Sequence, residues 1–264
     1  MKKFAVIGLG LIGGSIYKRL KTIGADVIGI SNSQCGSEPD IFNDINLVSK
    51  ANVIFVCTPM HKTFEILDKL ELIVSETTIV TDVCSIKEFV CKKERPYRFI
   101  PSHPMAGTEF QGFENSFDTL FEGAKWIFTP FQNNTTEQDI KTLSESVKDF
   151  GAKPIVTSPQ QHDEAVALIS HMPMLFSQAL VKAVEGNELA QQLAASGFRD
   201  TTRLALTNVD MALDMVNLNH ENIQKSVLKL YSALGEILKN DYAKNAASCK
   251  NLRESMYKDG KNIL

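Results

Sequence analysis

The sequence predicts an α/β domain built on a mostly parallel, doubly wound sheet, followed by an all-helical domain. Up to Thr157, short strand-like runs alternate with amphipathic helix-like segments, and no strand-like run follows. From Ser158 onward, the spacing of Ala and Leu residues is that of helices. Strands alternating with helices in this way are typical of parallel sheets that helices cover on both faces. We therefore expect two domains, residues 1–157 and 158–264.

Each element of the first domain follows from a local pattern. Runs rich in apolar and β-branched residues are expected to be strands at 3–7, 26–30, 52–57, 78–82, 98–102, 125–129 and 153–157. Amphipathic segments are expected to be helices at 11–24, 61–73, 85–94 and 136–151.

The start of the second domain has helix signals. Ser158 suits the cap, Pro159 the first helical position and Gln161 the third. Pro173 lacks an N–H, so it should remove the backbone hydrogen bond to Ile169 and bend the helix there.

Charge and cysteine content narrow the class of protein. A net charge of -3 and a pI near 6.0 argue against a nucleic-acid binder. Glycines interrupt the apolar run at the N-terminus, which is also too short to span a bilayer, so we expect neither a signal peptide nor a membrane anchor. Five cysteines without C-x-x-C spacing suit a reducing compartment, so we expect a cytoplasmic protein.

The strongest motif is the glycine pattern G-x-G-x-x-G at residues 8–13, which lies between the first strand and the first helix. In this context the pattern predicts a Rossmann dinucleotide site, with the diphosphate at the helix N-terminus. The alternative is a glycine-rich turn that binds no ligand. The residues expected to bind the cofactor are Gly8, Gly10, Leu11, Ile12, Gly13, Ser31, Asn32, Ser33, Thr58 and Pro59.

The end of the second strand bears on the choice of cofactor. NAD-binding domains place an Asp or Glu about 20 residues after the glycines, and here Ser31 takes that place. An acid would repel a 2′-phosphate by about 4 kcal/mol at about 4 Å and an effective dielectric of about 20. Ser31, Asn32 and Ser33 can instead donate hydrogen bonds, although residues 31–40 contain no Lys or Arg. We expect NADP to be preferred and NAD to be accepted more weakly.

Two polar groups mark further strand ends. His103 follows the 98–102 run, and it could be a turn residue, a buried structural group or a general base, since a neutral imidazole can accept a proton at cellular pH. Ser85 could orient His103 through its hydroxyl, cap the 85–94 helix, or do both.

The helical domain offers groups for an anionic substrate. His171 lies beside the expected bend and is a candidate substrate ligand, with a satisfied core histidine as the alternative; His162, nine residues earlier, should face the other way and lie at the surface or an interface. Arg199 and Arg203 are four residues apart on one expected helix face, with Asp200 able to hold Arg203. These arginines could bind carboxylates, or form an exposed ion pair.

Five blocks together resemble the TyrA family of prephenate and arogenate dehydrogenases. They are GLGLIGGS (8–15), TDVCSIK (81–87), HPMAGTE (103–109), ISHMP (169–173) and SGFRDTTR (196–203). The resemblance implies a Rossmann domain followed by a helical dimerisation domain, and the oxidative decarboxylation of a cyclohexadienol with NAD(P). Where the family usually has a glycine, this chain has Cys84, which should crowd the site slightly.

The resemblance also implies roles for single residues. His103 matches the catalytic histidine and Ser85 the serine beside it, while His171 and Arg203 match residues that bind the substrate. We further expect Thr108, Glu109, Arg199 and Asp200 near the substrate, with no metal. An acid such as Glu109 near the side-chain ammonium would favour arogenate; prephenate is the preferred interpretation. We expect no ligand-sensing module, so any feedback inhibition by tyrosine would have to act at the active site.

The expected assembly is a homodimer joined through residues 158–264, because the run AVALISHMPMLFSQALVKAV has more apolar surface than one small bundle usually hides. Two other classes of function were weighed. A 3-hydroxyacid dehydrogenase would need a lysine base, but the first lysine after Gln160 is Lys182. A dinucleotide sensor without activity would keep the glycines and would not need His103, Ser85 or Arg203.

Overall fold

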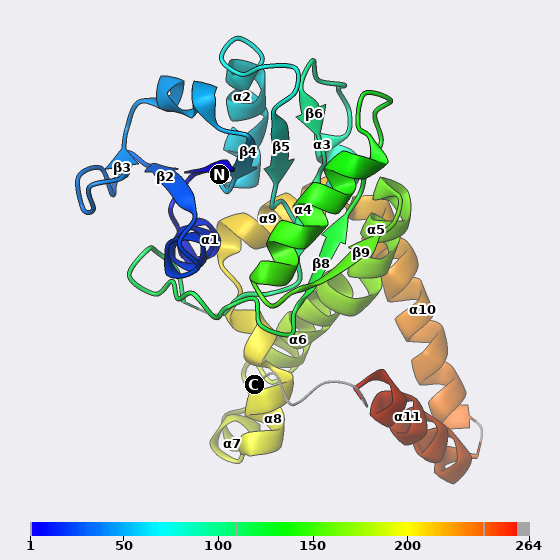
Figure 1. Cartoon of the computed structure of the whole chain (residues 1–264). Helices are drawn as coiled ribbons and strands as arrows, with labels where there is room; N and C mark the ends of the chain where they lie inside the picture. The colour runs from blue at the N-terminus through cyan, green and yellow to red at the C-terminus, as the bar shows by residue number, and fades with distance from the viewer. Residues whose placement is uncertain (1, 109, 240, 258–264) are drawn as a thin grey trace. The chain divides into compact units, whose positions relative to one another are not determined.

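A computed structural model describes residues 2–108, 110–239 and 241–257 (Figure 1). Packing groups the chain into two compact units. The first contains residues 1–165 and 206–218, and the second contains residues 166–205 and 219–264. The expected domain boundary at 157/158 stays a prediction, since a packing unit need not coincide with a folding domain.

The first unit is built on a six-stranded sheet in the order β3-β2-β1-β4-β5-β6. All five strand pairs are parallel, and the order reverses direction between β1 and β4. Such a reversal opens a crevice at the carboxyl ends of the strands, where ligands of this class of fold bind. The strands are β1 (Lys3–Ile7), β2 (Asp26–Ile30), β3 (Ile41–Phe42), β4 (Val53–Val56), β5 (Ile79–Asp82) and β6 (Arg98–Phe99).

Helices cover both faces of this sheet, as the sequence predicts. Alternate strand residues enter opposite cores: Phe55 packs in one and Ile54 in the other, and both are fully buried. The first core also holds the only tryptophan, Trp126, packed against Phe55 and Phe150. The covering helices are α1 (Leu11–Thr22), η1 (Ile45–Lys50, 3-10), α2 (Met60–Leu70), α3 (Lys87–Val90) and α4 (Glu137–Asp149).

A second, three-stranded sheet corrects one strand prediction. The 98–102 run is not one strand: β6 ends at Phe99, and β7 (Ser102–Pro104) begins a different sheet with β8 (Lys125–Phe128) and β9 (Lys153–Val156). Pro101 has no N–H to donate to a ladder, so the chain can leave the first sheet there. β7 pairs antiparallel with β8, which places His103 opposite Ile127.

The C-terminal part of the chain is helical, and Ser158 accepts a hydrogen bond from the N–H of Gln161 (3.1 Å) as its cap. The five residues before Met172 form a π-helical turn, which lies where the sequence predicts a bend because Pro173 lacks an N–H. The elements are α5 (Pro159–Val166), η2 (Ala167–His171, π), α6 (Met172–Ala183), α7 (Glu188–Gln192), α8 (Ser196–Thr201), η3 (Arg203–Leu206, 3-10), α9 (Val209–Leu218), α10 (His220–Lys239) and α11 (Tyr242–Met256).

One helical stretch, Pro159–Ala183, is long and apolar enough to cross a bilayer, with a mean hydropathy of 1.3 over its most apolar window. Length and composition alone do not separate such a helix from one that packs on protein. His162, Asp163 and His171 lie within this stretch and are buried with polar partners, which suits packing within protein.

Candidate active site

The glycine turn between β1 and α1 has the close contacts that its motif predicts. Gly8 has φ +91°, and a Cβ there would lie 2.8 Å from the carbonyl oxygen of Cys57. A Cβ on Gly13 would lie 1.9 Å from the carbonyl oxygen of Gly8, so neither position admits a side chain. A Cβ on Gly10 would meet no atom within 4 Å, and Gly10 caps α1 without a side-chain hydrogen bond. The N–H groups at the start of α1 can therefore bind an anion, as the diphosphate of a dinucleotide requires.

The other expected cofactor residues lie on the turns after β2 and β4. Ser31 is half-buried, Asn32 and Ser33 are exposed, and the two serine hydroxyls lie 3.3 Å apart. The Thr58 hydroxyl lies 3.2 Å from that of Thr63, and Pro59 caps α2. These turns belong to two strands that flank β1, at the same edge of the sheet as the glycine turn.

His103 is half-buried on β7 and its ring meets a second histidine. Nδ1 of His103 lies 2.9 Å from Nε2 of His162, and the two rings cross at 68°. His162 is 3% exposed, so the expectation that it lies at the surface or an interface is wrong. Its Nδ1 lies 2.7 Å from Oδ1 of Asp163.

Asp163 also caps helix α3, which corrects the role expected of Ser85. The N–H of Lys87 donates to Oδ1 and that of Glu88 to Oδ2, each at 2.8 Å. The hydroxyl of Ser85 donates to Sδ of Met60 at 3.6 Å. Ser85 therefore neither caps α3 nor orients His103 in this structure; the ring of His103 is held by His162.

A buried ion pair fixes β7 beside the carboxyl end of β5. Nζ of Lys87 donates to Oδ2 of Asp82 and to the carbonyl of Ser102, each at 2.6 Å, and both charged side chains are fully buried. The N–H of Ser102 donates to Oδ1 of Asp82, and Nε1 of Trp126 donates to the hydroxyl of Ser102 at 2.9 Å. His103 follows Ser102 directly, so this network sets where its backbone lies. This network was not predicted from the sequence, although two opposite charges five residues apart in an apolar block are a usable signal.

Cys84 lies within the same shell. Its N–H donates to Oδ2 of Asp82 at 2.8 Å, and its thiol lies 3.3 Å from the Thr63 hydroxyl. Burial raises the pKa of the Cys84 thiol, with the Asp82 carboxylate adding to the shift, so the thiol stays protonated.

Of the two loop residues expected near the substrate, Thr108 is exposed and its hydroxyl accepts a hydrogen bond from the N–H of Phe110 at 3.2 Å. Glu109 lies outside the described residues.

The candidates in the second unit differ in burial. His171 is 1% exposed on the π turn, and its Nδ1 lies 3.2 Å from Nδ2 of Asn219. Arg199 pairs with Asp200 (3.2 Å), with both side chains exposed, so Asp200 does not hold Arg203 as expected. The prediction that Arg199 and Arg203 share one helix face is also wrong, because α8 ends at Thr201 and Arg203 starts a 3-10 turn.

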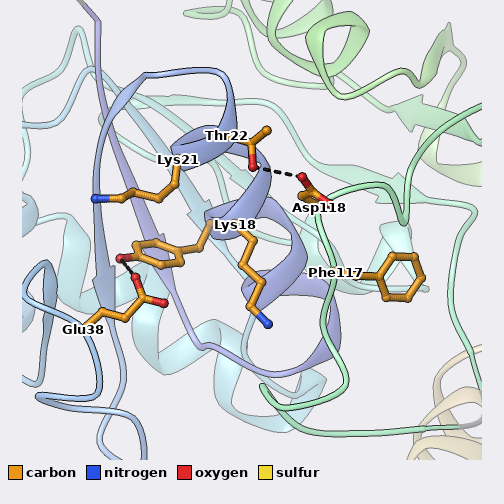
Figure 2. Close-up of a pocket in the computed structure, with 7 residues that line it drawn as sticks. Lys18, Lys21, Thr22, Glu38, Phe117 and Asp118 are labelled. Atoms are coloured by element: carbon orange, nitrogen blue, oxygen red, sulfur yellow. Dashed lines mark hydrogen bonds between the residues drawn. The ribbon is translucent and has the colours of Figure 1, made fainter.

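A hollow in the surface of the first unit lies beside α1 (Figure 2). It measures about 340 Å³, and hydrogen bonds from Thr22 to Asp118 (2.9 Å) and from Tyr17 to Glu38 (3.0 Å) cross its wall. Its lining contains none of the residues expected to bind cofactor or substrate, and we assign it no chemistry. The lining residues are Tyr17, Lys18, Lys21, Thr22, Glu38, Phe117 and Asp118.

Two family profiles match consecutive parts of the chain. The nucleotide-binding domain of prephenate dehydrogenase matches residues 20–156, and the dimerization domain of prephenate dehydrogenase matches residues 158–256. The chain belongs to the prephenate dehydrogenase family. The predicted family and the predicted fold class are therefore confirmed.

Individual relatives support the assignment to this family. Prephenate dehydrogenase of Bacillus subtilis is 32% identical over 82% of this chain, which spans 64% of that relative's length. The crystal structure of Synechocystis arogenate dehydrogenase is 32% identical, with a TM-score of 0.79 and coverage of 97% of this chain and 98% of that one. The structure of prephenate dehydrogenase from A. aeolicus with hydroxyphenyl propionate and NAD+ is 26% identical, with a TM-score of 0.81 and 98% coverage of both chains.

Proposed function

We propose that the protein is an NAD(P)-dependent dehydrogenase that converts prephenate to 4-hydroxyphenylpyruvate and CO₂, with arogenate, which would give tyrosine, as the alternative substrate. Two features of this family member together carry the proposal. One is a glycine turn with room for a ligand, and the other is a histidine beside the carboxyl end of β5. The first fits a dinucleotide diphosphate, and the second can take a proton where ligands of this fold bind.

The chemistry divides between cofactor and protein. NAD(P)+, when bound, accepts the hydride from the ring carbon that carries the hydroxyl group. His103 accepts the proton of that hydroxyl as a carbonyl forms, a step that a general base accelerates by about 10²–10⁴-fold. The bond to the ring carboxylate then breaks, its electron pair enters the ring, and the proton returns to oxygen to give the phenol and CO₂.

Other residues are proposed to bind the substrate. Arg203, with the planar fork of a guanidinium, suits the side-chain carboxylate, with His171 as a second ligand. Ser85, Thr108, Glu109, Arg199 and Asp200 remain candidates near the substrate. For Ser85 this would require its hydroxyl to turn away from Met60.

The direct test is turnover of prephenate and arogenate, each with NAD and with NADP. His103→Asn should lower kcat by at least about a hundredfold while cofactor binding stays nearly unchanged, since the base is lost and the glycine turn is not. A variant that keeps more than about a tenth of wild-type turnover would show that His103 is not the base.

We propose that NADP is preferred over NAD. Ser31, Asn32 and Ser33 place no carboxylate at the end of β2, and the hydroxyl groups of Ser31 and Ser33 lie together there. Ser31→Asp should shift the ratio of kcat/KM values toward NAD, because the new charge repels a 2′-phosphate. A wild-type kcat/KM that is about tenfold higher with NAD would contradict the preference.

We also propose a cytoplasmic homodimer, with a nucleotide-binding domain at 1–157 and a substrate-binding and dimerisation domain at 158–264. The match of residues 158–256 to a dimerization domain supports the assembly. The five cysteines, all of which are free thiols, suit a reducing compartment.

A further inference from the structure

The buried carboxylate of Asp163 has a fixed hydrogen-bonding polarity. Each of its two oxygens accepts a backbone N–H at 2.8 Å, from Lys87 and from Glu88. A backbone N–H can only donate, so both oxygens act as acceptors, and the carboxylate form satisfies this arrangement. With Asp163 1% exposed, these bonds are shielded from water.

This polarity sets the proton positions on both histidines. Oδ1 of Asp163 lies 2.7 Å from Nδ1 of His162, so Nδ1 of His162 carries the proton and donates it. Nε2 of neutral His162 is then an acceptor, and it lies 2.9 Å from Nδ1 of His103. Nδ1 of His103 must therefore be the protonated nitrogen.

We propose that His162 and Asp163 are positioning residues that hold neutral His103 in the Nδ1–H tautomer, so that Nε2 is the nitrogen that accepts the substrate proton. The proposal rests on the proposed function, in which His103 is the base. The hydrogen bond at one ring nitrogen decides which of the two is available for proton transfer. The same bond fixes the ring direction, since the backbone of His103 is held in the β7–β8 pair opposite Ile127.

The chain of donors also accommodates the charge that forms in the reaction. When Nε2 of His103 takes a proton, its Nδ1–H continues to donate to His162, and no hydrogen bond has to reverse. The carboxylate of Asp163 lies on the far side of His162, and its negative charge stabilises the positive charge that forms on His103. The arrangement resembles in logic the carboxylate that orients a histidine base in hydrolytic triads, with one more imidazole between the two.

Asp163 has a structural role as well, because it caps α3, and the test must separate the two roles. His162 allows this, since its ring contacts His103 and Asp163, while the N–H groups of α3 donate to Asp163. His162→Gln can still present an amide oxygen to Nδ1–H of His103 at the place of Nε2. His162→Leu removes the acceptor but keeps an apolar side chain of moderate size.

The experiment reads the tautomer of His103 directly from the ¹⁵N shifts of its ring nitrogens at a pH where the ring is neutral. The chain has five histidines, and His103→Asn identifies the signals of the one in question. The wild-type protein should show a protonated Nδ1 and an unprotonated Nε2. His162→Gln should keep this pattern and keep kcat within about threefold, whereas His162→Leu should give mixed tautomers and lower kcat by at least about tenfold, part of what a general base contributes.

Asp163→Asn gives an independent arm. Lys87 and His162 share Oδ1 of Asp163, and Glu88 uses Oδ2, so an asparagine can keep one of these sets but not both. If the amide oxygen stays with Glu88, the amide NH₂ faces Nδ1 of His162; His162 then carries its proton on Nε2, and His103 should show an unprotonated Nδ1. If it stays with Lys87 and His162, His103 should keep the wild-type pattern. The proposal is overturned if wild-type His103 carries its proton on Nε2, or if both His162 variants lose the same activity with an unchanged tautomer. A wild-type protein with the expected tautomer but no turnover of either substrate would instead contradict the proposed function and leave the positioning intact.

Discussion

At the scale of single residues, the chemistry of this protein depends on what each polar atom faces. Lys87 is fully buried, yet its ammonium group meets the Asp82 carboxylate and the Ser102 carbonyl. Removing one partner of such a pair costs about 3–5 kcal/mol, because the other charge is left buried. His103 follows Ser102 directly in the sequence, so the position of its backbone is set by an ion pair that takes no part in proton transfer.

Arg203 shows the opposite situation. In the described part of the chain, its exposed guanidinium has neither an ion pair nor a hydrogen bond, while Arg199 is paired with Asp200. If Arg203 binds a substrate carboxylate, Arg203→Ala should raise KM by an amount that corresponds to about 2–5 kcal/mol. Arg203→Lys should raise KM by a smaller amount, because lysine keeps the positive charge but loses the planar fork of the guanidinium. Steady-state kinetics measure both, and an unchanged KM in the alanine variant would place Arg203 among ordinary surface charges.

At the scale of elements, helix α4 has a complete capping box. The N–H of Asp139 donates to the Thr136 hydroxyl (3.2 Å), the N–H of Thr136 donates to Asp139 (2.9 Å), and Arg98 donates to Asp139 at 2.6 Å. Burial of Asp139 opposes its ionisation, but the hydrogen bonds from Thr136 and Arg98 outweigh burial and hold its pKa below the ordinary value of 3.8.

This cap predicts a pH-dependent stability. Because the folded pKa of Asp139 is below the unfolded one, its contribution is complete above about pH 4 and is lost as the pH falls through the folded pKa. Asp139→Asn should lower the free energy of unfolding by about 1–2 kcal/mol at pH 7. Urea titrations at several pH values should show the two proteins converging as the pH falls below about 4. A constant difference would mean that the ionised carboxylate is not what stabilises α4.

At the scale of the whole molecule, α10 carries large apolar side chains that the described residues of the chain leave exposed. Leu228, Tyr231 and Leu238 are 68%, 78% and 83% exposed. Large apolar side chains exposed along one helix are typical of protein interfaces, and the matched dimerization domain includes α10.

We therefore expect the wild-type protein to be a dimer at micromolar concentration in light scattering. Tyr231→Asp combined with Leu238→Asp should raise the dimer dissociation constant at least about a hundredfold, since burying one such side chain contributes about 1.5–3 kcal/mol. Leu72→Asp is the matched control, because Leu72 is 93% exposed in the first unit and should leave the mass unchanged. A monomeric wild-type protein would contradict the proposed assembly.

The sequence by itself determined the features that depend on neighbours along the chain. Strand and helix periods placed β1, β2, β4, β5, β8 and β9, but they missed β3 and merged β6 with β7. The spacing of Gly8, Gly10 and Gly13 specified a turn in which a Cβ would meet the backbone at two of the three positions. The cap at Ser158 and the π turn before Pro173 are likewise local, because each follows from one donor or one missing N–H.

Only the tertiary structure decided the partners of the polar groups. His103 and His162 are 59 residues apart in the sequence, and Asp163 caps a helix 76 residues before it. Ideal helical geometry placed His162 and His171 on opposite faces and so assigned His162 to the surface, but which face is buried depends on what packs against it. Arg199 and Arg203 failed to share a face because α8 ends between them. Hydrogen bonds between segments depend on where the chain brings them together, and no local period contains that information.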